Sequence, residues 1–253
     1  LVIDAQGLFK SALPAMLVHG PRAGLDRASA REPLSALLYQ RRYRVAREQH
    51  AVERVRQLFA QALAYPLPAE PPDYGLRFSH AHDAGRRRLV LLHGTTWPSK
   101  HWPESYWAGL ARLAADAGFE VVLPWGDPDD RLRAERIIKA AAAGELLPRQ
   151  GLSDLAHTLA TASGVVGVDS GLAHLAAAVG TPAVTLYGPT RTELTGALGP
   201  RQLNLAAQFE CAPCMQRVCD FRGPADVEPA CFGTLPPDLV FARLLAQMEA
   251  RAT

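Results

Sequence analysis

Three segments of the sequence combine residues that could bind an anionic ligand, and each lies between an apolar run and a predicted helix. In the most specific of them, residues 168–174 (VDSGLAH), the apolar run ends in Asp169, and Ser170 and Gly171 open the helix. The first amides of a helix have no intrahelical acceptor and carry partial positive charge, so they suit a diphosphate. His174 follows Ser170 by four residues and therefore projects from the same helix face. The pattern predicts a phosphate site, although a lone His on an Ala-rich helix can also be a packed core residue.

The second segment, residues 93–102 (HGTTWPSKHW), also follows an apolar run and precedes a predicted helix. Gly94 lets the backbone approach a ligand, Thr95 and Thr96 supply hydroxyl donors, and Lys100 supplies a positive charge suited to phosphate. A plain turn with an exposed lysine is the structural alternative.

The third segment, residues 124–130 (PWGDPDD), has the same position between an apolar run and a helix. Asp129 or Asp130 could cap the helix. A carboxylate here could alternatively accept hydrogen bonds from ribose hydroxyls. The spacing alone leaves both interpretations open.

The elements that must position these segments alternate regularly. Short apolar runs predict buried parallel strands at 88–93, 120–123, 164–168 and 183–187. Helices are predicted between and beyond them, at 103–118, 129–142, 152–162 and 171–179. This alternation predicts an α/β, doubly wound sheet, in which ligands bind at the carboxyl ends of the strands.

The first part of the chain is organised differently. Residues 1–5 read as the end of a strand, and helices are predicted at 7–17, 32–39 and 47–63. Residues 65–72 then hold four prolines and predict a stiff connector. We therefore expect an N-terminal domain with its linker over 1–72, whose first strands precede this chain. A second domain is expected over 73–235, and a C-terminal helix within 236–253.

The composition excludes several classes of protein. The 253 residues are 48% hydrophobic and 21% charged with a net charge of +2, which indicates a globular protein without the field that drives nonspecific nucleic-acid binding. No apolar run approaches the roughly 20 residues of a membrane-spanning helix, and the N-terminal residues do not resemble a signal peptide. Arg41, Arg42, Arg44 and Arg47 form a basic cluster that could meet an anionic membrane surface or lie on a solvated helix face.

All four cysteines fall in one stretch of the C-terminal third, namely Cys211, Cys214, Cys219 and Cys231. A secreted disulfide scaffold would spread its pairs across the fold, so we expect reduced thiols in a cytoplasm. The Cys-x2-Cys spacing with two further thiols also leaves a structural zinc site open.

Several motifs together resemble one protein family. They are residues 169–178 (DSGLAHLAAA), 187–190 (YGPT), the 95–102 loop, 2–8 (VIDAQGL) with Lys10, 31–33 (REP) and 50–54 (HAVER). With these motifs spread over nearly the whole chain, the sequence resembles the ADP-heptose:lipopolysaccharide heptosyltransferases of glycosyltransferase family 9. The resemblance is strongest to their heptosyltransferase I branch, without its N-terminal segment.

The resemblance implies a GT-B glycosyltransferase with two Rossmann-like domains, the acceptor-binding N-terminal one being incomplete in this chain. It implies an inverting transfer of heptose from ADP-L-glycero-D-manno-heptose to a Kdo sugar of lipid A, at the inner face of the cytoplasmic membrane. No metal is required for this transfer. The alternatives are heptosyltransferase II, a related sugar-nucleotide transferase, and a noncatalytic nucleotide-binding fragment.

The resemblance also assigns residues to roles. The donor-binding residues that it implies are Thr95, Thr96, Lys100, Asp130, Asp169, Ser170, Gly171 and His174. Lys100 and Asp169 would act in catalysis, and Arg31 would meet acceptor anions. Asp130 stands where the family more usually has Glu. The family's general base, an Asp in an N-terminal loop, has no match here, and Asp4 belongs to a different motif. An inverting transfer needs a base, so we expect this chain to be inactive alone or to be completed by a further N-terminal segment.

Overall fold

The computed structural model describes residues 1–78 and 87–250. The chain divides into two compact units, one built on Leu1–Pro71 and the other on Pro72–Thr192 with Gly196 onward. The division falls within the proline-rich segment 65–72.

The second unit is built on a six-stranded sheet in which every neighbouring pair of strands is parallel. In sheet order the strands are β6 (Glu145–Leu146), β5 (Glu120–Leu123), β4 (Arg88–Leu92), β7 (Gly164–Val168), β8 (Ala183–Tyr187) and β9 (Gln202–Ala206). The predicted doubly wound sheet is confirmed.

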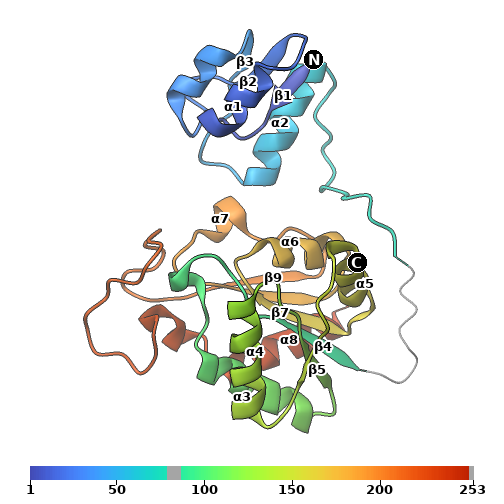
Figure 1. Ribbon diagram of the computed structural model, residues 1–253, viewed down its shortest axis with the longest axis vertical. Coiled ribbons are helices and arrows are strands. Elements are labelled where there is room, and N and C mark those ends of the chain that lie inside the picture. The colour runs from blue at the N-terminus through green and yellow to red at the C-terminus, as the bar shows by residue number, and fades with distance from the viewer. Residues whose placement is uncertain (79–86, 251–253) are drawn as a thin grey trace. The chain divides into compact units, whose positions relative to one another are not determined.

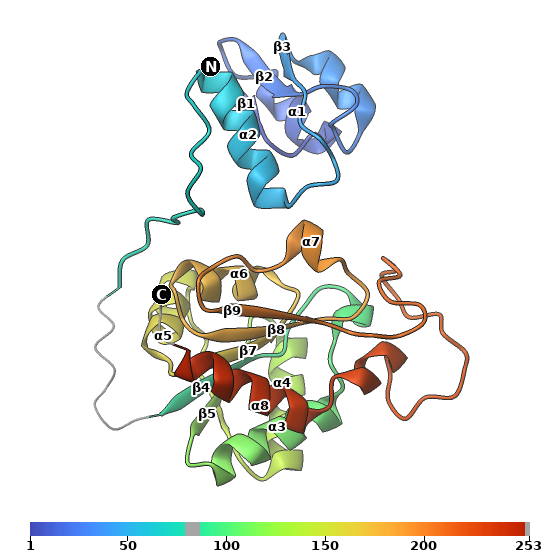
Figure 2. The same ribbon diagram turned by 180° about the vertical axis from the view of Figure 1, so that it is seen from behind.

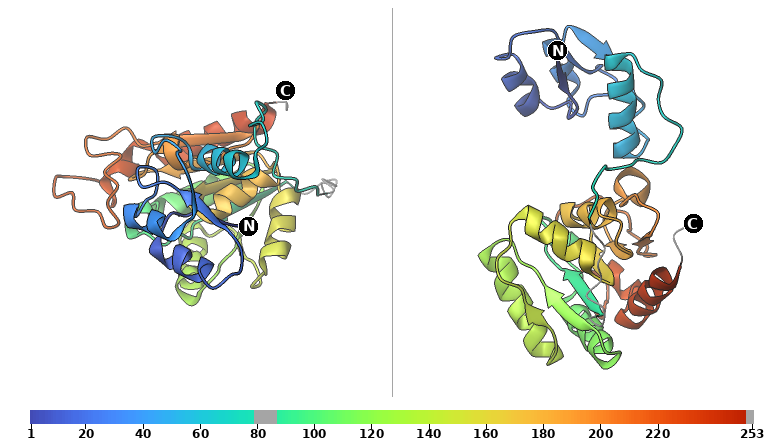
Figure 3. Two further views of the ribbon diagram at one scale, coloured as in Figure 1. Left: turned by 90° about the horizontal axis from the view of Figure 1, so that it is seen from above. Right: turned by 90° about the vertical axis from the view of Figure 1, so that its right-hand side faces the viewer.

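Helices lie on both sides of this sheet, as the right-hand view of Figure 3 shows. They are α3 (Glu104–Asp116), α4 (Pro128–Ala141), α5 (Leu152–Thr161), α6 (Gly171–Ala178) and α8 (Pro237–Glu249), and Figures 1 and 2 label them from opposite sides. The short elements η2 (Pro98–Lys100), α7 (Thr192–Thr195) and η3 (Ala230–Thr234) lie in loops.

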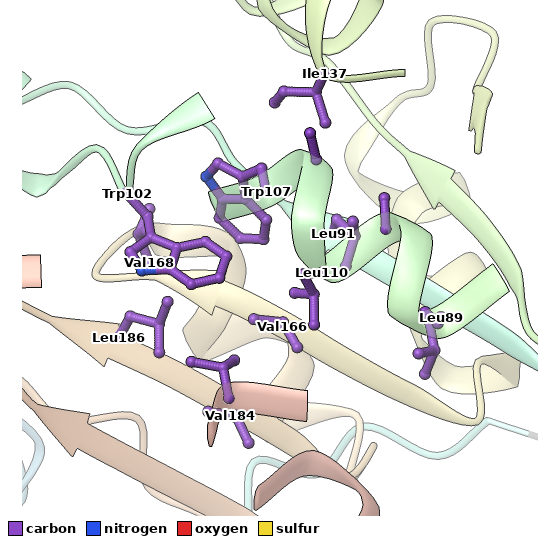
Figure 4. Close-up of a cluster of buried hydrophobic side chains, with 14 of the residues drawn as sticks. Leu89, Leu91, Trp102, Trp107, Leu110, Ile137, Val166, Val168, Val184 and Leu186 are labelled. Carbon is purple, nitrogen blue, oxygen red and sulfur yellow. The ribbon is translucent and has the colours of Figure 1, made fainter. Parts of the chain in front are cut away.

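Two apolar layers result, because successive strand residues point to opposite faces of the sheet. Leu89 and Leu91 face α3, α4 and α8, whereas Val90 and Leu92 face α5 and α6. Figure 4 shows the first layer, where Trp102 and Trp107 are fully buried. Burying one large apolar side chain stabilises a fold by roughly 1.5–3 kcal/mol, so these layers hold the strand ends in fixed positions.

Most predicted elements of this unit occur within two residues of their expected bounds. Helix α4 begins one residue early because Asp127 caps it: its carboxylate accepts a hydrogen bond from the Asp130 amide at 2.9 Å. The expectation that Asp129 or Asp130 is the cap is therefore wrong. The sequence pattern did not predict β6, β9, α7 or the short 3-10 helices η2 and η3. Helix α8 ends at Glu249, and residues 251–253 of the predicted C-terminal segment 236–253 lie outside the described residues.

The first unit has a parallel sheet of β1 (Val2–Asp4), β2 (Arg22–Leu25) and β3 (Arg41–Tyr43), with helices α1 (Phe9–Ala15) and α2 (Ala51–Leu63). Its small core includes Leu25, Val45 and Leu58.

Three expectations for this unit need correction. Residues 33–38 form the 3-10 helix η1 (Pro33–Leu38) instead of an α-helix. Helix α2 begins at residue 51 instead of 47, because the His50 ring caps the Val52 amide. Arg41 and Arg42 lie in the edge strand β3, so the helix-face interpretation of the basic cluster is wrong.

No helix in the described segments combines the length and the apolar character that crossing a membrane requires.

Candidate functional site

The centre of the site is an ion pair between two of the predicted donor-binding residues. The Lys100 ammonium lies 2.7 Å from an Asp169 carboxylate oxygen, and the two side chains are only 16% and 8% exposed. Lys100 follows β4, and Asp169 follows β7, its neighbour in the sheet. The carboxyl ends of adjacent parallel strands meet at one edge, which brings residues 69 positions apart in the sequence into contact.

Asp169 has a second partner that the sequence analysis did not assign to the site. Thr190, in the loop after β8, donates its hydroxyl to the same carboxylate at 2.7 Å. Thr95 donates its hydroxyl to the Asp169 backbone carbonyl at 3.2 Å. Asp169, which follows β7, is therefore contacted by the loops after both neighbouring strands, β4 and β8. The sequence does place Thr190 shortly after the predicted strand 183–187, at the end of the YGPT motif, which could have indicated a role in the site.

Helix α6 begins directly beside this ion pair. The Ser170 hydroxyl makes no capping bond, and it is buried without a hydrogen-bond partner within residues 1–78 and 87–250. Buried hydroxyls are nearly always hydrogen-bonded, so an orphan one at a helix N-terminus requires an explanation. A Cβ built on Gly171 would meet nothing, which means that the space next to its backbone is open. Amides, hydroxyl and open space together suit phosphate oxygens.

His174 lies on α6, four residues after Ser170, and is half-buried. Thr96 is exposed in the loop that follows β4. The Lys100 ammonium lies 4.5 Å from the centroid of the Trp97 ring, within the range of a cation–π contact. The predicted donor residues of the β4 loop and of α6 therefore share one edge of the sheet.

Asp130 reaches the same loop from α4. A Cβ on Gly94 would approach both oxygens of the Asp130 carboxylate to 2.9 Å, so glycine is required for this approach. Asp130 also accepts a hydrogen bond from Arg133 at 3.0 Å. The structure places the carboxylate at the predicted edge, and its contact with a ribose stays a prediction.

His93 directly follows β4, at the start of the loop that carries Lys100, and is fully buried. One ring nitrogen, Nε2, lies 3.2 Å from the Pro124 carbonyl at the end of β5. Because that carbonyl can only accept, Nε2 carries the proton. Burial, with a smaller effect from the Arg133 charge, lowers the pKa of His93 to about 4. The ring is therefore neutral and joins the loops after β4 and β5.

The four cysteines are free thiols. Burial, and to a smaller extent the neighbouring cysteines, raises the pKa of Cys231 to about 12. Within the described part of the chain, no three His, Cys, Asp or Glu side chains are arranged to hold a metal ion. This arrangement gives the zinc interpretation no support, and a structural zinc site stays a prediction.

In the first unit, Arg31 is exposed and lies two residues before the start of η1. The turn that carries it packs on Gly7, whose φ of +64° favours glycine and where a Cβ would lie 3.1–3.3 Å from Ala30 and Arg31. Asp4 is buried, and its carboxylate accepts hydrogen bonds from the hydroxyls of Tyr39 and Ser11 and from the Gln6 amide. These bonds give Asp4 a structural role.

Comparison with known proteins identifies the fold and the site together. The family described as glycosyltransferase family 9 (heptosyltransferase) matches residues 1–224. The chain belongs to this family. Lipopolysaccharide heptosyltransferase 1 of Pseudomonas aeruginosa is 48% identical over 265 residues, a match that covers 100% of this chain and 75% of that protein.

Solved structures agree with the sequence comparison. The Escherichia coli heptosyltransferase WaaC with ADP superposes with a TM-score of 0.78 at 38% identity, covering 97% of this chain and 72% of that one. The same enzyme with ADP-2-deoxy-2-fluoro heptose gives a TM-score of 0.74 at 37% identity, covering 97% and 71%. The chain thus has the GT-B-like α/β fold of the heptosyltransferases and is a glycosyltransferase by family.

Proposed function

We propose that this chain carries the donor-binding unit and part of the acceptor-binding unit of a lipopolysaccharide heptosyltransferase I. The reaction is an inverting transfer of heptose from ADP-heptose to a Kdo sugar of lipid A. The observation that carries the proposal is the buried Lys100–Asp169 ion pair beside the open N-terminus of α6. The similarity to an enzyme solved with ADP and with an ADP-heptose analogue supports the identity of the donor.

The site favours departure of a diphosphate. An ammonium group has three donors, and Lys100 uses one of them on Asp169, which leaves others for the phosphate oxygens. As the bond to the heptose breaks, negative charge grows on those oxygens. A fixed cation and the first amides of α6 stabilise that charge without reorganising. Asp169 acts mainly by holding the ammonium in place.

The remaining predicted residues complete the proposal. Asp130 would accept from the ribose, while Thr96 and His174 would contact the diphosphate and the heptose. Arg31 would meet anionic groups of the acceptor from the first unit. The base that deprotonates the acceptor hydroxyl is not assigned to any residue of this chain.

Peripheral contact with the inner face of the cytoplasmic membrane is part of the same proposal. Arg41, Arg42, Arg44 and Arg47 are exposed at and beyond the edge strand β3. Basic residues near an anionic surface contribute about 1 kcal/mol each. Cosedimentation with anionic vesicles should weaken when Arg41 and Arg42 are replaced by Ser. Unchanged binding would exclude this strand as the contact.

Two measurements test the proposed reaction. Calorimetry should show that the chain binds ADP more tightly than UDP or GDP, and the absence of ADP binding would refute the donor site. Transfer from ADP-heptose should then be compared on Kdo2-lipid A and on an acceptor that already carries heptose, using the protein with a complete acceptor unit. Preference for the heptosylated acceptor would exclude the heptosyltransferase I assignment.

A further inference from the structure

The segment Cys211–Cys219, which we call the cysteine loop, lies against the loop that carries Lys100. The Ser99 hydroxyl donates to the Gln216 carbonyl at 2.6 Å, and the Ser99 amide donates to the Arg217 carbonyl at 3.2 Å. Ser99 is only 2% exposed and directly precedes Lys100 in η2. The hydroxyl and the backbone amide of this buried residue are therefore both satisfied by a segment more than 100 positions away in the sequence.

The cysteine loop also contacts the loop after β8. The Met215 amide donates to the Pro189 carbonyl at 2.8 Å, and Pro189 directly precedes Thr190. Thr190 and Lys100 both donate to the Asp169 carboxylate. The cysteine loop and Asp169 therefore contact the same two loops, one carrying Ser99 and Lys100 and the other carrying Pro189 and Thr190.

Two further observations indicate that this arrangement is fixed. Met215 has a φ of +58°, in the left-handed region that non-glycine residues rarely adopt, and such a conformation persists only where the surroundings hold it. The indole of Trp97 also contacts two cations, one from its own loop and one from the cysteine loop. Lys100 is 4.5 Å and the Arg217 guanidinium 5.4 Å from its centroid.

We propose that the cysteine loop positions Lys100 for the donor diphosphate and that Ser99 is the positioning residue through which it acts. The proposal rests on the function proposed above for Lys100. An ammonium on a flexible four-carbon stem loses effect when its backbone is displaced. The loop fixes the backbone end of the Lys100 side chain, and Asp169 fixes its charged end.

The test is a double-mutant cycle read by ADP affinity, which requires no acceptor. Ser99→Ala should weaken ADP binding by about fivefold, the size of effect expected when one neutral hydrogen bond is lost. In the Lys100→Ala background the same substitution should change ADP affinity by less than about 1.5-fold, because there is then no ammonium to position. Ser105→Ala, at an exposed position on α3, is the matched control and should change neither.

Met215 supplies a second probe should Ser99→Ala fail to fold. Met215→Val places a β-branched residue at positive φ and should weaken ADP binding severalfold. Met215→Asn tolerates that conformation and should bind like the wild type. Full effects that persist in the Lys100→Ala background would show a merely structural role and overturn the proposal, as would unchanged affinity in both Ser99→Ala and Met215→Val. A wild-type chain that fails to bind ADP would instead refute the proposed function.

Discussion

Two buried aspartates, one in each unit, lie at equivalent places at the carboxyl end of a parallel strand and have different surroundings. Asp4 ends β1 and Asp169 follows β7, and each residue is 6% exposed. Asp4 accepts from the Tyr39 hydroxyl at 2.6 Å and the Ser11 hydroxyl at 2.8 Å. Asp169 accepts from Thr190 and from an ammonium group, both at 2.7 Å.

The two aspartates differ in how many donor protons their hydrogen-bond partners keep available for a ligand. A hydroxyl has a single proton. Tyr39 gives its proton to Asp4, and Ser11 shares its proton between Asp4 and the Leu8 carbonyl. An ammonium has three, so Lys100 can be held by Asp169 and still bind phosphate. An aspartate at a strand end does not by itself indicate a ligand site. The group that donates to it does, and here that group is an ammonium at Asp169 and hydroxyls at Asp4.

The largest effect is expected at Asp169. Asp169→Asn removes the charge that pairs with a buried ammonium and should destabilise the second unit by about 3 kcal/mol, because breaking a buried ion pair costs roughly 3–5 kcal/mol. It should also weaken ADP binding by up to about tenfold, the loss expected when the Lys100 ammonium no longer binds the phosphates. Urea unfolding and calorimetry measure both effects. Asp4→Asn is the matched control, and a loss of ADP affinity there would remove the distinction between the two residues.

His93 provides a test at a third strand end, where the buried group is neutral in the folded chain. Its pKa of about 4 lies below the ordinary value of 6.5, so the unfolded chain binds more protons between these pH values. Stability from this group is complete above pH 6.5 and is lost as pH falls toward 4, by roughly 3 kcal/mol. His93→Gln keeps a donor for the Pro124 carbonyl and should flatten this part of the stability curve. Parallel curves for the two proteins would contradict the assignment.

Lys100→Ala should lower the rate of heptose transfer by about 100-fold, as the loss of one electrostatic donor to a developing charge does in other enzymes. ADP affinity should fall by less, roughly tenfold, because the interaction strengthens as the bond breaks. Steady-state rates and calorimetry give the two values. Equal losses would assign Lys100 to ground-state binding alone.

Tyr39→Phe removes one donor from Asp4 and should cost the first unit about 2 kcal/mol, typical of a hydrogen bond to a charged acceptor. ADP affinity should be unchanged. Denaturation of the variant, followed by ADP calorimetry, checks both expectations, and altered nucleotide binding would mean that the first unit affects the donor site.

Thr190→Val is the mildest change, because it removes one neutral donor from Asp169 and leaves Lys100 in place. We expect a loss of about 1 kcal/mol in stability and a reduction in ADP affinity of roughly twofold to fivefold. Ser11→Ala, which removes the equivalent donor from Asp4, should cost similar stability with no change in affinity. Identical affinity for wild type and Thr190→Val would leave Thr190 with a structural role only.

The sequence predicted elements well where local pattern and burial agree. Strands β5, β7 and β8 are continuous apolar runs and occur at their predicted bounds. Strand β3 was not predicted, because its sequence, RRY, has no apolar pattern. An edge strand with exposed side chains does not require one. Helix α2 begins late because a histidine, an uncommon cap, ends the preceding loop.

Some contacts of the site could also be predicted from the sequence, and others could not. The meeting of Lys100 and Asp169 follows from the rule that ligands bind at the carboxyl ends of parallel strands, so sequence reasoning could anticipate it. The contact of Ser99 with Gln216 spans 117 positions and depends on how an irregular loop folds back. No periodicity or spacing encodes such a contact, and only the tertiary structure reveals it.

The strand order of the larger sheet also determines which loops reach Asp169. Strands β4 and β7 are neighbours, yet the chain leaves β4 toward α3 on one face and leaves β7 toward α6 on the other. The two exits diverge at the carboxyl ends of this pair of strands, which is the place where ligands bind in open α/β sheets. The loop after β5 contributes no hydrogen bond or ion pair to Asp169 among the described residues, so we expect substitutions there to leave the contacts of Lys100, Thr95 and Thr190 with Asp169 unchanged.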